Sequence, residues 1–127
     1  MDDHKFFLCE HCKNLIGMIH NSGVPIFCCG EPMKLLEANT ESDAKEKHLP
    51  IVKINRNEVI VEVGGTFHPM TENHFIRWIY LQTEKGGQRK GLLPDELPRA
   101  IFALEKDKPV AAFAYCNLHG LWETKLQ

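Results

Sequence analysis

The sequence predicts a mostly β protein: an antiparallel β-sandwich of about seven short strands, preceded by a small Cys₄ metal-binding domain. Three observations lead to this prediction. Runs of β-branched and aromatic residues recur from residue 48 to residue 125, glycine and proline turn signals separate those runs, and four of the five cysteines fall within the first 29 residues. No stretch has the length and periodicity of a long helix.

The strand pattern is clearest in residues 58–63. Val59, Val61 and Val63 alternate with other residues, which is the period-2 signature of a strand with one buried face. Glycines at 86 and 87 are expected to turn the chain, and a turn at 106–109 is expected to close a later hairpin. The predicted strands are residues 48–54, 58–63, 75–81, 89–93, 100–104, 110–115 and 121–125.

The domain prediction follows from where the apolar residues lie. The chain has 127 residues, enough for one compact domain with a small appendage. Residues 1–37 carry few apolar side chains, so a bound metal would have to stabilise them, whereas residues 38–127 carry the sandwich. Between the two, residues 37–47 are polar and predict a linker or a single helical turn.

Charge and hydropathy exclude several classes of partner. The chain has 15 Lys+Arg against 17 Asp+Glu, a formal charge of −2, and so lacks a basic field suited to nucleic acid or an anionic membrane. No apolar run approaches the roughly 18 residues of a spanning helix. Acidic residues stand near Met1 where a signal peptide would be basic. The expectation is a cytoplasmic protein that binds neither nucleic acid nor membrane.

The N-terminal cysteines form a pattern typical of a tetrahedral metal site. Cys9 and Cys12 are a C-x-x-C pair, and the adjacent Cys28 and Cys29 follow after fifteen residues. Four sulfurs suit iron and zinc alike, so spacing leaves the metal open. Neighbouring side chains in extended backbone diverge, so Cys28 and Cys29 can bind one ion only if the chain bends locally. The histidines of this region are expected to face solvent: His4, His11 and His20.

A second set of donor residues lies at the ends of the predicted strands. Strand ends at one pole of a sandwich converge, and Pro50 and Pro69 restrict the backbone beside two of these histidines. Four imidazoles and one thiolate favour a redox metal such as iron, with a sixth coordination position left for a small oxidant. A blue-copper site is disfavoured because no methionine follows the cysteine. The donors are His48, His68, His74, Cys116 and His119.

These motifs resemble the desulfoferrodoxin family, the two-iron superoxide reductases. The resemblance covers nearly the whole chain, and it implies a desulforedoxin-like, rubredoxin-type iron domain at residues 1–37 and an immunoglobulin-like catalytic domain at residues 38–127. The segments that carry it, besides the four N-terminal cysteines, are Glu46-Lys47-His48-Leu49-Pro50, His68-Pro69-Met70 with His74, and Cys116-Asn117-Leu118-His119-Gly120.

The resemblance also implies the activity: superoxide receives one electron and two protons and leaves as hydrogen peroxide. Two mononuclear non-haem irons per chain are implied, one in the Cys₄ site and one with four equatorial histidines and Cys116 as the axial ligand. Lys47 would attract the anionic substrate and help to deliver protons, and Glu46 would occupy the sixth position of the oxidised ion. A rubredoxin-like electron donor, a homodimer and a role in superoxide detoxification are further implications.

Two other functions are consistent with the residues alone. One is an electron carrier or zinc-stabilised binding module in which the sandwich histidines are incidental and Glu46 and Lys47 are a solvated charged pair. The other is dismutation, which would release dioxygen. Metal analysis separates the first from a reductase, since the reductase requires two irons per chain.

Overall fold

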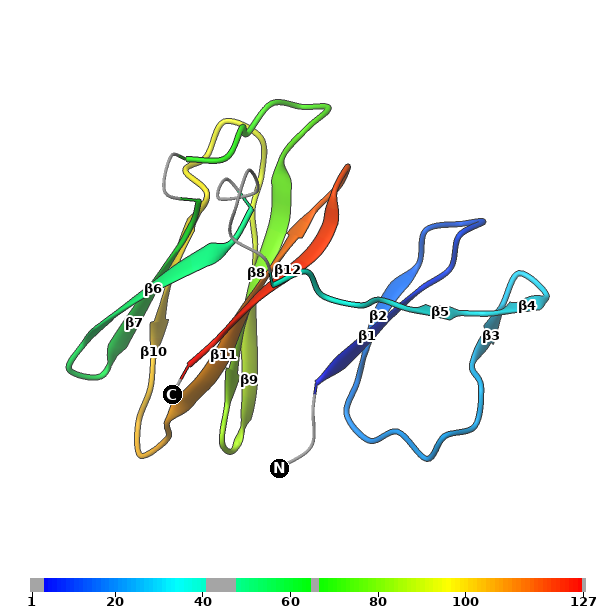
Figure 1. The fold of residues 1–127 in the computed structure, drawn as a ribbon, viewed down its shortest axis with the longest axis horizontal. Coiled ribbons are helices and arrows are strands. Elements are labelled where there is room, and N and C mark those ends of the chain that lie inside the picture. Colours follow the sequence, from blue (N-terminus) through cyan, green and yellow to red (C-terminus); the bar gives the residue numbers. More distant parts are fainter. Residues whose placement is uncertain (1–3, 41–47, 65–66, 127) are drawn as a thin grey trace. The chain divides into compact units, whose positions relative to one another are not determined.

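The protein folds entirely from strands and turns in the part of the chain that the structure describes. The structure is a computed structural model that describes residues 4–40, 48–64 and 67–126 (Figure 1). Within those ranges no helix is long and apolar enough to cross a membrane. Contacts divide the chain into two compact units, Met1–Glu37 and Ala38–Gln127, called unit 1 and unit 2 below. The predicted all-β class is confirmed.

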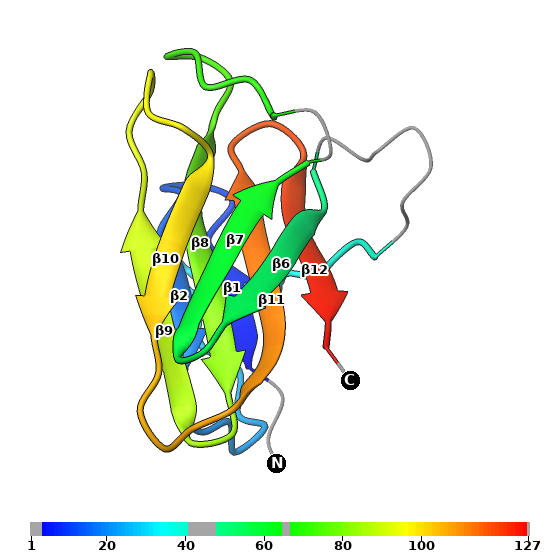
Figure 2. The same ribbon diagram turned by 90° about the vertical axis from the view of Figure 1, so that its left-hand side faces the viewer.

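Unit 2 is a sandwich of two antiparallel sheets, which face each other in Figure 2. One sheet has the order β10-β7-β6 and the other the order β12-β11-β8-β9. The described part of this unit therefore has seven strands, the number that the sequence predicts. They are β6 (Pro50–Asn55), β7 (Glu58–Val63), β8 (Ile76–Thr83), β9 (Gly86–Gly91), β10 (Arg99–Ala103), β11 (Pro109–Cys116) and β12 (Gly120–Lys125).

The largest departure from the predicted ranges is at β9. The two glycines expected to turn the chain belong to the strand, where Gly86 pairs with Thr83 and Gly87 with Gln82. The prediction of a glycine turn at this point was therefore wrong. A side chain on Gly87 would overlap the ring and hydroxyl of Tyr80, so the glycine is required by close packing.

The core lies between the two sheets and follows the period-2 pattern. Val59, Val61 and Val63 are each at most 1 % exposed, while the alternate residues of β7 are more open. Phe102 on the neighbouring strand β10 is fully buried and is the largest side chain among the most buried residues. The core cluster consists of Val59, Val61, Val63, Ile76, Ile79, Leu81, Ala100, Phe102, Leu104, Ala112, Ala114 and Cys116.

Truncation of Phe102 to alanine is expected to destabilise the protein by about 3–5 kcal/mol, because it removes a buried ring and leaves a cavity in a packed core. Chemical denaturation followed by circular dichroism measures this change. Leu97→Ala is the matched control, since that side chain is 59 % exposed and should change the free energy of unfolding by less than about 0.5 kcal/mol. Equal effects of the two substitutions would contradict the assignment of Phe102 to the core.

Unit 1 is built from very short strands and buries little apolar surface. Among its described residues only Phe6 and Cys9 are buried, while Ile19, Val24 and Phe27 are 99 %, 69 % and 64 % exposed. Such a unit lacks a core of its own. The strands are β1 (Lys5–Leu8), β2 (Leu15–Met18), β3 (Phe27–Cys28), β4 (Glu31–Pro32) and β5 (Lys34–Leu35), in sheets of order β2-β1-β5 and β3-β4.

The segment predicted as a linker contains no helical turn in residues 37–40. Asn39 forms a parallel bridge with Trp122, its backbone N–H donates to Leu121 at 2.9 Å, and its carbonyl accepts from the Glu123 N–H at 2.9 Å. This bridge ties the beginning of unit 2 to β12. The rest of the predicted linker, residues 41–47, lies outside the described residues.

Candidate metal centres

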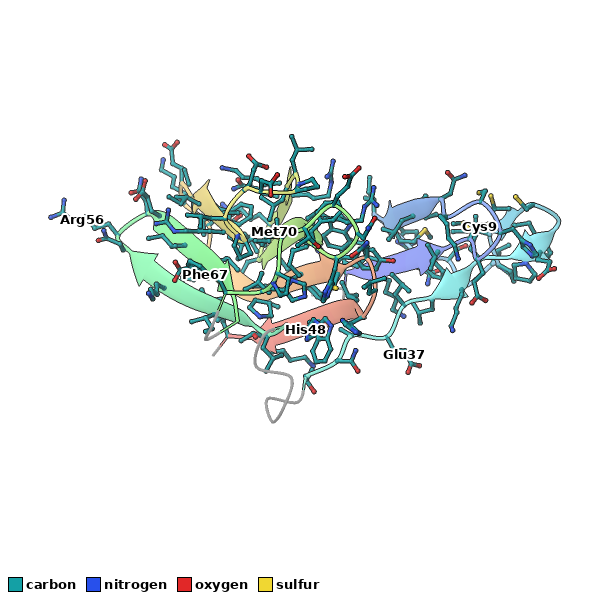
Figure 3. The ribbon with its side chains drawn as sticks, turned by 90° about the horizontal axis from the view of Figure 1, so that it is seen from above. Cys9, Glu37, His48, Arg56, Phe67 and Met70 are labelled. Atoms are coloured by element: carbon teal, nitrogen blue, oxygen red, sulfur yellow. The ribbon has the colours of Figure 1, made fainter. Side chains whose placement is uncertain are left out.

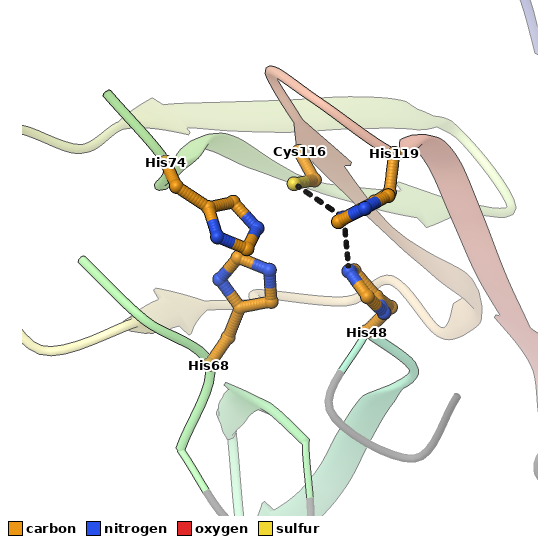
Figure 4. A group of neighbouring side chains, drawn as sticks. All are labelled: His48, His68, His74, Cys116 and His119. Carbon is orange, nitrogen blue, oxygen red and sulfur yellow. Dashed lines mark hydrogen bonds between the residues drawn. The ribbon is translucent and has the colours of Figure 1, made fainter. Parts of the chain in front are cut away.

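One pole of the sandwich gathers five donor side chains that are far apart in the sequence (Figure 4). One ligand atom from each of them lies within 4.8 Å of every other. Cys116 ends β11 and His119 directly precedes β12, while His48 and His74 lie two residues before β6 and β8. His68 lies in the loop between β7 and β8. The structure thus brings together the whole set expected from the sequence: His48, His68, His74, Cys116 and His119.

The four imidazoles lie at the corners of a closed quadrilateral, in which each imidazole has two neighbours. The centroid distances around it are 4.7 Å from His48 to His68, 4.7 Å from His68 to His74, 5.1 Å from His74 to His119, and 4.8 Å from His119 to His48. Neighbouring rings meet at 65° to 83°, so each presents an edge toward the next. Four edges arranged in this way can supply four nitrogens around a single centre.

Backbone hydrogen bonds hold the segments of His48 and His68 beside each other. The N–H of Gly64 donates to the carbonyl of Leu49 at 2.9 Å, and the N–H of His68 donates to the carbonyl of Val63 at 3.2 Å. Nδ1 of His68 lies 2.7 Å from the carbonyl oxygen of Pro69. Because a carbonyl can only accept, Nδ1 carries the proton and Nε2 is left as the metal-binding nitrogen.

The sulfur of the set comes from the interior of the sandwich. Cys116 ends β11 and is fully buried, whereas His119 is exposed. Burial raises the pKa of the Cys116 thiol, and the backbone N–H groups of Leu118 and His119, which stabilise the thiolate, oppose that rise. Sγ of Cys116 lies 3.8 Å from Nδ1 of His119. Gly120, with φ of +82°, supplies the left-handed conformation that turns this loop into β12.

Trp122 contacts two of the histidines. Its indole stacks on the His48 ring at 4.7 Å between centroids and 16° between planes, and its Nε1–H donates to the carbonyl of His119 at 3.1 Å. The Trp122 side chain is only 4 % exposed, so its packed indole limits where the His48 ring and the His119 backbone can lie. The sequence interpretation missed Trp122; its position three residues after His119 was the available signal.

The donor set fits one metal ion. With bonds of about 2.1 Å, donors on opposite sides of an ion stand about 4.2 Å apart and adjacent donors about 3 Å apart. Nε2 of His48 and Nδ1 of His119 are 3.0 Å apart, and the whole set spans at most 4.8 Å. Imidazoles combined with a thiolate suit iron better than the oxygen-seeking ions. These residues could therefore hold a mononuclear iron.

The second centre consists of the four N-terminal cysteines, whose sulfurs also lie within 4.8 Å of one another. In Figure 3 sulfur atoms lie near the labelled Cys9. Sγ of Cys12 and Sγ of Cys28 are 3.6 Å apart, close to the roughly 3.8 Å expected between sulfurs on a tetrahedral ion. The predicted local bend is present: Cys29 and Gly30 have φ of +53° and +78°, so both adjacent cysteines reach the same centre.

The thiols of this cluster differ in acidity. Hydrogen bonds from the backbone N–H of Cys12, joined by that of His11, lower the pKa of Cys9 to about 6 against the opposing effect of burial. The neighbouring sulfurs of Cys12 and Cys9 raise the pKa of Cys29 to about 12. Binding of a metal ion must therefore displace protons from part of the cluster.

The histidines of unit 1 belong to neither of the two donor groups. His11 is exposed and pairs with Glu31 at 3.0 Å, and His20 is exposed. Sequence reasoning also missed Asn14, whose Nδ2 donates to Sγ of Cys28 at 3.5 Å; nothing in the spacing of the cysteines marked it. Glu46 and Lys47, the two charged residues expected at the sandwich site, lie outside the described residues.

The sequence matches a known family model over unit 2 and known relatives over nearly its whole length. The family model described as desulfoferrodoxin matches residues 40–125. A desulfoferrodoxin of Nitratidesulfovibrio vulgaris is 41 % identical over 124 residues, which cover 98 % of each chain.

Solved structures are similar as well. A superoxide reductase from Treponema pallidum is 36 % identical, with a TM-score of 0.84 over 97 % of this chain and 98 % of that one. A one-iron superoxide reductase from Giardia intestinalis is 33 % identical, with a TM-score of 0.55 over 65 % of this chain and 98 % of that one. The first structure thus matches nearly the whole of this chain, and the second matches about two thirds of it.

Proposed function

The chain belongs to the desulfoferrodoxin family, and from this premise we propose that it is a superoxide reductase, which converts superoxide to hydrogen peroxide with one electron and two protons. The observation that carries the proposal is the closed ring of four imidazoles with a buried thiol beside it. We assign this reaction to unit 2 as the catalytic domain, and a desulforedoxin-like iron domain to unit 1.

The side chains at the sandwich site have different proposed roles in binding the iron. Bound iron supplies a one-electron redox couple and a coordination position for a small anion. The four histidines would bind the iron through their ring nitrogens, and Cys116 would bind it from the buried side, where its thiolate would donate electron density. His119 is exposed while Cys116 is buried. We therefore propose that superoxide enters from the solvent side of the four imidazoles, opposite the Cys116 sulfur.

Charge supports a role for Lys47. Superoxide is an anion, and the chain has a formal charge of −2, so a local cation is needed to draw the substrate to the site. Lys47 precedes the ligand His48 directly and is assigned this task together with delivery of protons. Glu46 is assigned as a carboxylate that would bind the iron in its oxidised form and release it in its reduced form.

The remaining assignments follow from the chemistry of the sites. Electrons come from an external carrier of the rubredoxin type, and the reaction serves to detoxify superoxide. We place the protein in the cytoplasm, because five cysteines assigned as metal ligands require a reducing compartment. The proposal also includes a homodimer, which size-exclusion chromatography with light scattering would test.

The decisive experiment exposes the reduced, iron-loaded protein to superoxide by pulse radiolysis and quantifies the products. One hydrogen peroxide per superoxide, with no dioxygen released from the protein reaction, is the expected result. Release of dioxygen would identify a dismutase. Metal analysis of anaerobically purified protein should give two irons per chain; zinc without iron, or a loaded protein inert to superoxide, would refute the proposed function.

Replacement of Lys47 by isoleucine is expected to slow the second-order reaction with superoxide about 10-fold or more without releasing iron, because local electrostatic attraction changes association rates by about 10 to 1,000-fold. Pulse radiolysis gives the rate constant, which should no longer depend on ionic strength in the Lys47→Ile variant. The control is Lys125→Ile, which removes an exposed lysine at the last residue of β12, whereas His119 of the site directly precedes the first residue of that strand. An equal loss of rate in both variants, or loss of iron from Lys47→Ile, would contradict the assigned role.

A further inference from the structure

Asn117 lies inside the Cys116-x-x-His119 loop, yet its side chain is bonded to a different loop. Its Oδ1 accepts a hydrogen bond from the backbone N–H of Phe75 at 2.9 Å, and its Nδ2 donates to the carbonyl of Asn73 at 2.9 Å. Its backbone N–H also donates to the carbonyl of Phe75 at 3.2 Å. Phe75 and Asn73 are the two residues that flank His74, so one amide holds the backbone on both sides of that histidine.

The sheet itself does not provide this connection. Strands β8 and β11 pair regularly from Ala111 to Tyr115, which lies opposite Trp78, but the register then shifts so that Cys116 lies opposite Ile76. Such an irregularity interrupts the ladder of backbone hydrogen bonds. The Asn117 side chain therefore continues the link between the two chain segments beyond the point where the regular ladder ends.

Other bonds within the His74 loop fix its shape rather than its position. The backbone N–H groups of Thr71 and His74 donate to each other's carbonyls at 3.0 and 3.1 Å, and Thr71 Oγ1 donates to the His74 carbonyl at 3.2 Å. These bonds are internal to the loop and do not join it to the segment of Cys116. The backbone N–H of Asp95 donates to the carbonyl of Met70 at 2.8 Å, which ties the start of the loop to the segment before β10 instead. The three bonds of Asn117, in contrast, join the loop to the segment that begins with Cys116.

We propose that Asn117 is a positioning residue that fixes the His74 imidazole relative to the Cys116 sulfur, and so sets the distance between one nitrogen donor and the sulfur donor. The identity of the metal rests on the proposed function; the positioning of the donors does not. Outer residues that orient metal ligands typically account for 10–100-fold in metal affinity.

The test compares three variants of the full chain loaded with iron. Asn117→Ala removes both side-chain bonds, and Asn117→Asp keeps the shape and the acceptor but loses the Nδ2 donor. Asn73→Ala is the matched control, because it removes an exposed asparagine side chain from the same loop while keeping the carbonyl that Asn117 uses. Iron release to a chelator and the thiolate-to-iron absorption band are followed together, with the absorption of the Cys₄ iron as an internal reference.

Asn117→Ala is expected to release the sandwich iron about 10-fold faster or more and to shift its thiolate band, with Asn117→Asp between it and the wild type. The Cys₄ absorption and the Asn73→Ala variant should match the wild type. Wild-type release rates and an unshifted band in both Asn117 variants would overturn the proposal, as would an equal effect of Asn73→Ala. Asn117→Asp decides the question if Asn117→Ala does not fold.

The reaction with superoxide is measured separately on the wild type. A wild-type protein that binds iron but is inert to superoxide would refute the proposed function. The comparison of metal release among the variants would still decide whether Asn117 positions the donors.

Discussion

Replacement of Cys116 by serine is expected to abolish the absorption band of the ferric thiolate and to weaken iron binding at the sandwich site by at least about 100-fold, more than the loss of an outer residue that orients a ligand. Cys116 is the single sulfur among the five donors and is fully buried. A serine hydroxyl at this place is a poor ligand at neutral pH and leaves a buried polar group. Visible spectroscopy of the oxidised protein and iron titration measure the two effects.

The neighbouring substitution Tyr115→Phe is the control for Cys116→Ser, since it removes an oxygen from the adjacent residue of β11 without touching a donor. It should leave the band and the iron content unchanged. A ferric-thiolate band that persists in Cys116→Ser would show that Cys116 is not a ligand, and the role assigned to it would be lost.

Replacement of Cys9 by serine is expected to release the iron of unit 1 and to unfold that unit, while unit 2 keeps its iron. Of the described residues of unit 1 only Phe6 and Cys9 are buried, so a metal bond supplies stabilisation that the small apolar surface cannot. Iron per chain should fall from two to one. Limited proteolysis should then cut within residues 10–30 while residues 48–126 stay resistant.

The matched control for Cys9→Ser is Ile19→Ser, which makes the same kind of polar change at a side chain that is 99 % exposed. Two irons and unchanged protease resistance are expected there. The prediction is contradicted if Cys9→Ser keeps both irons, or if it also destabilises the sandwich. In the latter case the two units would not be independent in stability, contrary to the division in their contacts.

Most of the sandwich could be predicted from local pattern. The predicted strand 58–63 has the same bounds as β7 in the structure. Its valines alternate along the chain and so lie on one face, which is the face that is buried. At β9 the pattern misled: Gly86 and Gly87 are common turn residues, but here they extend a hairpin whose packing against Tyr80 excludes a side chain. That contact joins residues on two different strands, and no local rule predicts it.

The candidate sites were also predicted in part. The donors themselves were identified because cysteine and histidine clusters are chemically conspicuous. The residues that hold them were not: Asn14, Asn117 and Trp122 act through contacts with neighbours that become apparent only after folding. An asparagine or a tryptophan has many ordinary roles, and its type alone does not distinguish among them.

The sequence by itself determined the approximate positions of the strands along the chain, the weakness of the N-terminal core and the chemical types of the donors, because these depend on residue type and spacing along the chain. Only the tertiary structure decided that four imidazoles close into a ring, with the Cys116 thiol on its buried side. The physical reason is that this arrangement joins residues 48 to 119 through long-range pairing of strands and through loop contacts. Those free energies belong to the folded chain as a whole rather than to any local segment.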